Sequence, residues 1–225
     1  MRDPQHFTFN AEARTRYRAE WGIGDDECVV GYLARIDVLK GTREFASSSD
    51  HLDRADKRRI RLVVIGEPSI GSHRPDGTPV PEPSAADLVA WLHDRAKDPD
   101  HRLVVRPFTT DPAGVMSAFD IFVLATYGEM YALTVLEAMM VGLPVIGTNS
   151  DGTPDQLADG RGLCVEPRSA SAIAEGISFM LHHPEQREIM AKKGHDWAVK
   201  EFDPRIVAPQ WISLYNNVLQ QRQTR

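Results

Sequence analysis

Two glutamates, Glu129 and Glu137, stand eight positions apart in the apolar stretch from Gly128 to Gly147. On a helix, eight positions span about 12 Å at 1.5 Å per residue. The paired carboxylates that hydrolyse a glycosidic bond lie roughly 5 to 9.5 Å apart, so this spacing better fits contacts with opposite ends of an elongated polyol ligand. The helix N-terminus between the two glutamates offers free N–H groups and a positive dipole end, which suit a phosphate or diphosphate.

The residues around Glu137 predict a covered helix, because almost every position from Tyr131 to Val141 is apolar. A carboxylate on such a helix needs hydrogen-bond partners, from protein or from ligand. Gly142 predicts a left-handed C-terminal cap, and residues 143–147 then predict a short buried strand. The structural alternative is that Glu129 favours the dipole of the first turn while Glu137 pairs with a core arginine. Spacing alone leaves the two interpretations even.

A pair of cations lies in the segment ARIDVLKG, where Arg35 follows an apolar run directly and Lys40 comes five residues later, before Gly41. In open parallel sheets, ligands bind beyond the carboxyl ends of the strands. A guanidinium and an ammonium on such a strand-to-helix loop are placed to bind a diphosphate. Taken alone, the segment fits a solvated basic loop better.

Short apolar runs alternate with helical stretches along the chain and predict an α/β fold. Continuous apolar runs are typical of parallel strands that are covered on both faces, with right-handed crossover helices between them. The sequence therefore predicts a single Rossmann-like doubly wound domain with a six-stranded parallel sheet and C-terminal helices. The six runs are CVVGYLA, RLVVIG, RLVVRPF, IFVLAT, LPVIGT and GLCVEP.

Composition limits the classes of function. A chain of 225 residues can bury the core of one α/β domain, or at most of two small ones. The net charge of -6 and the pI near 5.7 argue against nucleic-acid binding. Cys28 and Cys164 lie far apart without a C-x-x-C pair, which favours a reduced, cytosolic protein. No apolar run approaches membrane-spanning length, and MRDPQHFTFN lacks a signal-peptide core, so we expect a soluble chain.

The segment ATYGEMYALTVLEAMMVGLPVIG resembles the E-x7-E signature of retaining glycosyltransferases of family 4, which have the GT-B fold. The usual form of that signature runs close to PS-x-x-EGFGL-x-x-LEA-x-x-x-GxPV. Met130 and Ala132 stand where the family usually has glycines. The family's R-x4-K-G pattern falls on Arg35, Lys40 and Gly41.

A second segment, TNSDGTPDQLADGRGLCVEP, resembles the family's GG-x-PE-x-V…G-x-x-G-x-L-V-x-P, with Asp151 in place of a glycine and Asp155 in place of a glutamate. The resemblance as a whole extends from about Asp3 to the last helix. It implies that the chain corresponds to the C-terminal, donor-nucleotide-binding half of a GT-B enzyme. In such enzymes the active site lies in a cleft between two domains.

The resemblance also implies roles for individual residues. Glu137 would hydrogen-bond the ribose hydroxyls, and Glu129 with the backbone amides after it would contact the sugar. Arg35, Lys40 and the helix N-terminus would stabilise the departing diphosphate. Arg106, at the end of the third apolar run, is either a contact to the nucleotide base or a surface arginine. The implied catalytic residues are Glu129, Arg35 and Lys40, and the implied nucleotide-sugar-binding residues are Arg35, Lys40, Gly66, Arg106, Glu129, Met130, Tyr131, Ala132, Leu133 and Glu137.

The function that follows from the resemblance is retaining, metal-independent transfer of a hexosyl group from a UDP-, GDP- or ADP-linked sugar. The acceptor, a sugar or a lipid-linked sugar, would be bound by an N-terminal domain or a partner chain. A full-length enzyme would act in the cytoplasm or at the inner membrane surface. The alternatives are a non-catalytic subunit or sensor that binds sugar nucleotides, and an epimerase of the same two-domain architecture.

The implied domain organisation has three parts. Residues 1–27 are a linker and an N-terminal helix from Ala11 to Trp21, residues 28–200 are the nucleotide-sugar-binding domain, and residues 201–225 are a final helix that packs on the first domain in two-domain relatives. Without that domain, the final helix would expose an apolar patch or bind a partner. Further helices are predicted over residues 112–119, 172–181, 184–200 and 206–221. Trp197, Trp211 and Tyr215 are predicted to be packing residues.

Residues 67–86 hold five prolines and are predicted to form no regular element. They look like an insertion relative to the family, as either a lid at the ligand end of the sheet or a disordered surface loop.

Other chemistries lack support in the sequence. The D-x-D pattern at Asp98 and Asp100 precedes a strand and so lies at the wrong edge of the sheet, and His182 and His183 are adjacent without ligand spacing. The sequence has no G-x-S-x-G motif and no P-loop. We therefore expect no metal and no redox cofactor.

Overall fold

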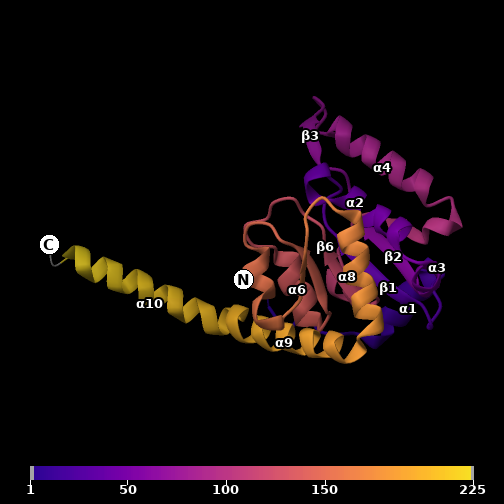
Figure 1. The fold of residues 1–225 in the computed structure, drawn as a ribbon. Helices are drawn as coiled ribbons and strands as arrows, with labels where there is room; N and C mark the ends of the chain where they lie inside the picture. Colours follow the sequence, from indigo (N-terminus) through magenta and orange to yellow (C-terminus); the bar gives the residue numbers. More distant parts are fainter. Residues whose placement is uncertain (1–2, 224–225) are drawn as a thin grey trace.

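The computed structural model of the protein describes residues 3–223 and contains a six-stranded, fully parallel sheet (Figure 1). Each of the six apolar runs forms one of its strands, so the predicted α/β sheet is confirmed. The strands are β1 (Cys28–Leu33), β2 (Ile60–Ile65), β5 (Leu103–Arg106), β6 (Ile121–Leu124), β7 (Val145–Thr148) and β8 (Leu163–Val165).

Helices connect these strands and cover both faces of the sheet. The α-helices are α1 (Ala11–Trp21), α2 (Thr42–Ser47), α3 (Arg54–Arg59), α4 (Pro83–Arg95), α5 (Pro112–Ser117), α6 (Leu133–Val141), α7 (Thr153–Leu157), α8 (Ala170–His182), α9 (Pro184–Phe202) and α10 (Pro204–Gln223). The 3-10 helices are η1 (Val38–Lys40), η2 (Ser48–His51), η3 (Pro99–His101) and η4 (Ala158–Gly160). Within residues 3–223, no helix is both long enough and apolar enough to cross a membrane.

Alternating strand residues supply two separate hydrophobic cores, one on each face of the sheet. On β1, Val29 belongs to the core under α1, α5, α6 and α9, whereas Val30 belongs to the core under α2, α4 and α8. Phe7 and Trp21 belong to the first of these cores, so the N-terminal segment packs against the sheet. This double coverage explains why the strands are apolar without alternation.

The order of the strands, β5-β2-β1-β6-β7-β8, reverses direction between β1 and β6. The chain leaves β1 toward β2 and β5 on one side, and it continues from β6 toward β7 and β8 on the other. The loops after β1 and β6 therefore diverge from one point at the carboxyl edge, and in open α/β sheets that point is where ligands bind.

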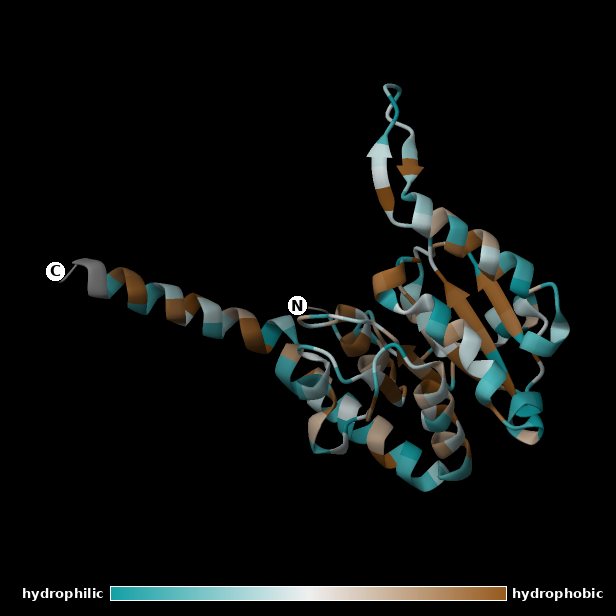
Figure 2. Ribbon diagram, turned by 45° about the horizontal axis from the view of Figure 1, so that its top comes forward, coloured by the Kyte–Doolittle hydropathy of each residue, from teal (hydrophilic) through white to brown (hydrophobic). Residues whose placement is uncertain are grey.

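Residues 67–86 are not irregular, so that prediction is wrong. They contain an antiparallel hairpin of β3 (Ile70–His73) and β4 (Pro79–Pro81), and α4 begins at Pro83. The prolines occupy positions that tolerate them, since a separate two-stranded hairpin has two open edges and Pro83 stands in the first turn of α4. Gly77, with φ of 84°, provides the turn. The hairpin projects from the body of the molecule (Figure 2).

The last helix, α10, continues beyond α9 and projects away from the sheet (Figure 1). The prediction that Trp211 and Tyr215 are packing residues is wrong, because 50% and 62% of these side chains are exposed, and their rings contact each other. Trp197 does pack, with its edge against the ring of Phe202. The exposed apolar patch expected on this helix is present, and it comprises Ile206, Trp211, Ile212, Leu214, Tyr215, Val218 and Leu219.

Candidate functional site

Two loops meet at the point where the strand order reverses. The carbonyl oxygen of Leu39, in the loop after β1, accepts hydrogen bonds from the backbone N–H of Tyr127 (2.8 Å) and from the hydroxyl of Thr126 (3.2 Å), in the loop after β6. These bonds join segments almost ninety positions apart in the sequence. The loop that carries Arg35 and Lys40 and the loop that carries Glu129 therefore form one site.

Lys40 and Glu129 form an ion pair across these loops, with 2.5 Å between Nζ and Oε2. About a quarter of each side chain is exposed, so the pair is open to solvent and to a ligand. Lys40 ends the short helix η1, whose first turn is capped by the carboxylate of Asp37. The structure thus brings together two of the three implied catalytic residues.

Gly41 allows the Lys40 loop to adopt its shape. Its φ of 66° lies in the left-handed region, and a Cβ atom at this position would come within 1.8 Å of the carbonyl oxygen of Ala125, at the end of β6. Only glycine meets both requirements without a shift of backbone. The glycine of the R-x4-K-G pattern is therefore a geometrical requirement of the junction between the two loops.

The N-terminus of α6 also lies near this junction, because the helix begins four residues after Glu129. The helix begins at Leu133, two residues later than predicted, and its N-cap Ala132 has no side-chain cap. The first N–H groups of the helix have no partner within it, as in any α-helix. Gly142, with φ of 93°, ends the helix in the left-handed conformation, which confirms the predicted cap.

Gln156 fixes the start of α6, and no pattern in the sequence predicts this role. Its side-chain amide is fully buried and makes two hydrogen bonds with the backbone of Ala132: Oε1 accepts from the N–H and Nε2 donates to the carbonyl oxygen, each at 3.0 Å. The N–H of Ala132 is therefore occupied by protein in this structure, and the next amides along α6 are the ones that can receive a ligand.

The side chains around Glu129 differ in accessibility. Met130 is 86% exposed, and Tyr131 and Leu133 are about 40% exposed, whereas Ala132 is buried. The carbonyl oxygen of Met130 lies so close to Gly152 that a Cβ atom there would meet it at 1.8 Å. The loop after β7 thus packs directly against the backbone of Glu129 and Met130. The side chain of Met130 remains exposed to solvent.

Glu137 lies in α6 and is almost fully covered, with 4% of its surface exposed. It is one helical turn beyond the first residues of α6, beneath the exposed N-terminal turn. The structure therefore does not present this carboxylate openly at the surface.

Arg35 lines a cavity of about 350 Å³ at the carboxyl ends of β1, β2 and β5, which we call the Arg35 cavity. Gly66 also lines it, and a Cβ atom on Gly66 would come within 1.9 Å of the carbonyl oxygen of Ala34. Backbone therefore forms part of the cavity surface. The complete lining is Ala34, Arg35, Gly66, Glu67, Pro68, Ile70 and Phe108.

Arg106 does not line the Arg35 cavity. It lines a smaller cavity of about 130 Å³ beside α1, and its guanidinium donates a hydrogen bond to the carbonyl oxygen of Val105. Phe108, two residues later, lines both cavities and is 63% exposed. An aromatic residue directly after a strand at the ligand edge is the signal that could have identified Phe108.

Asp37 links the cation loop to the β3–β4 hairpin. One carboxylate oxygen accepts a hydrogen bond from the N–H of Leu39 (2.8 Å) and the other accepts one from the hydroxyl of Ser69 (2.7 Å). The pKa of Asp37 is lowered, chiefly by the Ser69 hydrogen bond; burial opposes the shift, and the Leu39 amide and the nearby Arg35 and Lys40 add to it. Asp37 is therefore ionised near neutral pH.

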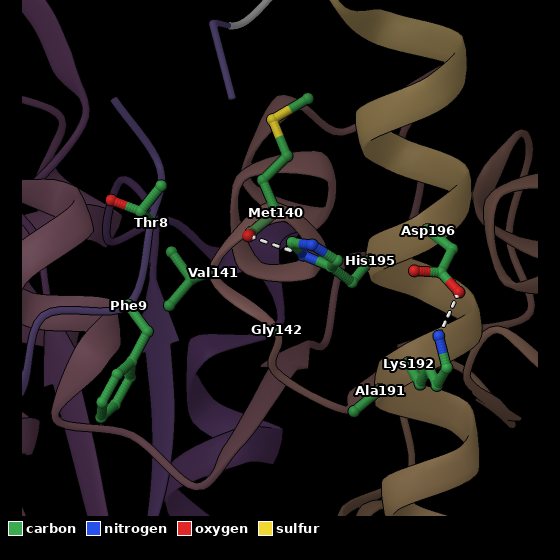
Figure 3. Close-up of a pocket in the computed structure, with 9 residues that line it drawn as sticks. All are labelled: Thr8, Phe9, Met140, Val141, Gly142, Ala191, Lys192, His195 and Asp196. Atoms are coloured by element: carbon green, nitrogen blue, oxygen red, sulfur yellow. Dashed lines mark hydrogen bonds and ion pairs between the residues drawn. The ribbon is translucent and has the colours of Figure 1, made fainter. Parts of the chain in front are cut away.

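A third cavity, of about 360 Å³, lies at the other end of α6 and is drawn in Figure 3. His195 points to the carbonyl oxygen of Met140 there (2.9 Å), and Lys192 pairs with Asp196. The nine residues of α6 separate the two ends of the helix by about 13 Å. Neither Arg35 nor Lys40 lines this cavity, so the candidate site is the one at the N-terminus of α6.

Solved structures with the same fold support the architecture. The structure of Anabaena Alr3699/HepE in complex with UDP-glucose matches 96% of this chain and 56% of its own, with a TM-score of 0.81 and 18% identity. The C-terminal domain of the glycosyl transferase group 1 family protein LpcC from Francisella tularensis matches 90% of this chain and 99% of its own, with a TM-score of 0.70 and 24% identity. The fold is that of one half of a GT-B enzyme.

Sequence comparison identifies the family. Residues 13–197 match the family described as glycosyl transferases group 1. The D-inositol 3-phosphate glycosyltransferase of Corynebacterium glutamicum (strain R) is 30% identical over 212 residues, which cover 93% of this chain and 48% of that protein. The chain belongs to the group 1 glycosyltransferases, as the E-x7-E and R-x4-K-G patterns predicted, and it spans about half the length of the curated relatives it matches.

Proposed function

We propose that this chain is the donor domain of a retaining, metal-independent glycosyltransferase that binds a nucleotide-diphosphate sugar and transfers a hexosyl group. The observation that carries the proposal is the convergence of Lys40, Glu129 and the N-terminus of α6 where the strand order reverses, with Arg35 on the same β1 loop. A solved structure with the same fold contains UDP-glucose.

The chemistry of this site is electrostatic. When the bond between the anomeric carbon and the diphosphate breaks, negative charge grows on the leaving phosphate oxygens. Arg35, Lys40 and the first N–H groups of α6 are preformed positive groups that lower the energy of this charge. Glu129, beside Lys40, would accept hydrogen bonds from the sugar hydroxyls, and Glu137 would accept them from the ribose once the ligand is bound.

The partner of this domain is the part of the enzyme that binds the acceptor. In the proposal, an additional domain or a partner chain supplies the acceptor site, for a sugar or a lipid-linked sugar in the cytoplasm. A non-catalytic subunit that binds sugar nucleotides is the second candidate, because Arg35, Lys40 and Glu137 would be needed for binding alone. The production of free sugar or of a transferred glycoside would exclude the second candidate.

The proposal is tested by calorimetric titration of the chain with UDP, GDP, ADP and their common sugar conjugates, without added metal. We expect saturable binding of one nucleotide. Glu137→Gln keeps the size of the buried side chain, and we expect it to weaken that binding by about 1.5 to 3 kcal/mol, as is typical when hydrogen bonds to a charged group are lost. Glu188→Ala, an exposed glutamate on α9, is the matched control and should bind like the unchanged chain.

The Arg35→Ala variant distinguishes binding of the diphosphate from binding of the nucleoside. It should weaken diphosphates much more than nucleosides, since only diphosphates carry charge for the guanidinium. Equal losses for both ligands would remove Arg35 from the phosphate site. A folded Glu137→Gln variant with unaltered affinity would likewise remove Glu137 from the site.

A further inference from the structure

Two large apolar side chains, Ile70 and Phe108, line the Arg35 cavity while remaining about half or more exposed, at 51% and 63%. They come from different elements: Ile70 is the first residue of β3, and Phe108 follows β5. An exposed isoleucine and an exposed phenylalanine in one cavity leave apolar surface in water, which a flat, partly apolar ligand would cover.

The position of Ile70 is fixed by the anchoring of the hairpin base. The N–H of Ile36 donates to the carbonyl oxygen of Glu67 (2.7 Å), and the N–H of Ser69 donates to that of Ile36 (3.2 Å). The hydroxyl of Ser69 also donates to Asp37, the residue that caps the Lys40 helix. The hairpin base is therefore held rigidly against the segment that carries Arg35 and Lys40.

The Arg35 cavity and the two cations lie next to each other, as the base and the diphosphate of a nucleotide do. Arg35 belongs to both, because it lines the cavity and lies on the β1 loop that ends in Lys40. A group bound between Ile70 and Phe108 would thus be directly connected to a diphosphate at the cations. A nucleobase has the required chemistry, since every base has a π face that stacks on an aromatic ring.

We infer that the β3–β4 hairpin is a nucleotide-recognition element, in which Ile70 and Phe108 contact opposite sides of the nucleobase in the Arg35 cavity. This inference rests on the proposed function, because it assumes a nucleoside diphosphate at Arg35 and Lys40. It adds a specificity role for the hairpin, and it moves the predicted base contact from Arg106 to Phe108.

The test uses the purified chain and compares two probes, the nucleoside diphosphate that binds best among UDP, GDP and ADP, and inorganic pyrophosphate, which lacks the base. Ile70→Ala and Phe108→Ala should each weaken the nucleotide about tenfold, which corresponds to the lower part of the range for loss of base stacking. Pyrophosphate affinity should be unchanged in both variants. Phe108→Tyr keeps the aromatic ring and should restore nucleotide affinity.

Ile189→Ala is the matched control, because Ile189 is 55% exposed on α9 and does not line the cavity. It should leave both affinities unchanged. Nucleotide affinity that survives both Ile70→Ala and Phe108→Ala, or an equal loss of pyrophosphate and nucleotide, would overturn the inference while the donor site stands. No nucleotide binding by the unchanged chain would overturn the proposed function and this inference together.

Discussion

The ion pair between Lys40 and Glu129 satisfies both charges within the protein itself. An unpaired lysine and an unpaired glutamate at a helix N-terminus would both be solvated, whereas here they neutralise each other at 2.5 Å. Because the pair is partly exposed, its net contribution to stability is of the order of 1 kcal/mol or less. In the proposed function, a diphosphate, which carries more negative charge than one carboxylate, would displace Glu129 from Lys40, and Glu129 would then contact hydroxyl groups of the sugar.

The two hydrogen bonds between the Gln156 side chain and the backbone of Ala132 should contribute measurably to stability. Gln156→Ala removes both partners from the buried backbone N–H and carbonyl of Ala132. Leaving these groups unsatisfied should lower the free energy of unfolding by about 2 to 4 kcal/mol. Urea unfolding followed by circular dichroism measures the change, and Asn149→Ala, in the exposed loop after β7, is the control. A loss below 0.5 kcal/mol, roughly the scatter of surface substitutions, would show that water replaces the amide.

Individual residues differ in how far the sequence determines them. The sequence alone places Arg35, Lys40 and Gly41 together in one short loop after β1, whereas their assignment to a site depends on the family resemblance. The role of Gln156 could not be predicted, because its partners are backbone groups 24 positions away and any short polar segment could have supplied them. Glu137 was located in the right helix, but its 4% exposure depends on packing from elements distant in the sequence.

At the scale of elements, the strands were predictable and the hairpin was not. A strand buried on both faces needs an unbroken apolar run, which the sequence displays directly. The β3–β4 hairpin instead follows from details of position: Pro79 and Pro81 lie in the short strand β4, its partner β3 has a register shift between Ile70 and Ser72, and Gly77 closes the turn. The number of prolines predicts an irregular segment only if every position must donate a backbone hydrogen bond. In a two-stranded hairpin, many positions face an open edge and need no such bond, so proline is tolerated there.

The attachment of this hairpin gives a prediction with a defined pH dependence. Ser69→Ala removes the hydrogen bond that is the chief cause of the lowered pKa of Asp37. A carboxyl group whose pKa is lower in the folded state stabilises the fold above its unfolded value of about 3.8, and this contribution disappears as the pH falls through the folded value. We therefore expect the variant to lose about 1 to 2 kcal/mol of unfolding free energy at pH 7, and this deficit should shrink as the pH falls below about 3.8 toward the lower pKa of the folded state.

Urea unfolding of the two proteins at a series of pH values between 7 and 3 measures this difference. Ser84→Ala is the control, since Ser84 is an exposed serine in the first turn of α4. A deficit in Ser69→Ala that stays constant down to pH 3 would mean that the serine stabilises the hairpin without acting on the Asp37 carboxylate.

At the scale of the whole molecule, helices cover both faces of the sheet, whereas the apolar side chains of α10 are exposed. Between Ile206 and Gln220, no residue of α10 carries a charge, although the seven side chains of its apolar patch are each about half exposed. A helix that normally faced water would have a charged side. In the donor-domain proposal, this surface is the one that meets the remaining part of the enzyme.

Removal of residues 204–225 tests this division of the molecule. Because the apolar side chains of α10 lie outside both hydrophobic cores, their loss should change the unfolding free energy by less than about 1 kcal/mol, and nucleotide affinity should be preserved. The intact chain should self-associate as its concentration rises, because an exposed apolar patch favours association in water. The shortened chain, which lacks this patch, should remain monomeric. Sedimentation velocity over a range of concentrations, combined with urea unfolding, separates the two effects. A markedly less stable shortened chain would mean that α10 folds back on the sheet domain in solution, and the apolar surface would then belong to the interior of this domain instead of an interface.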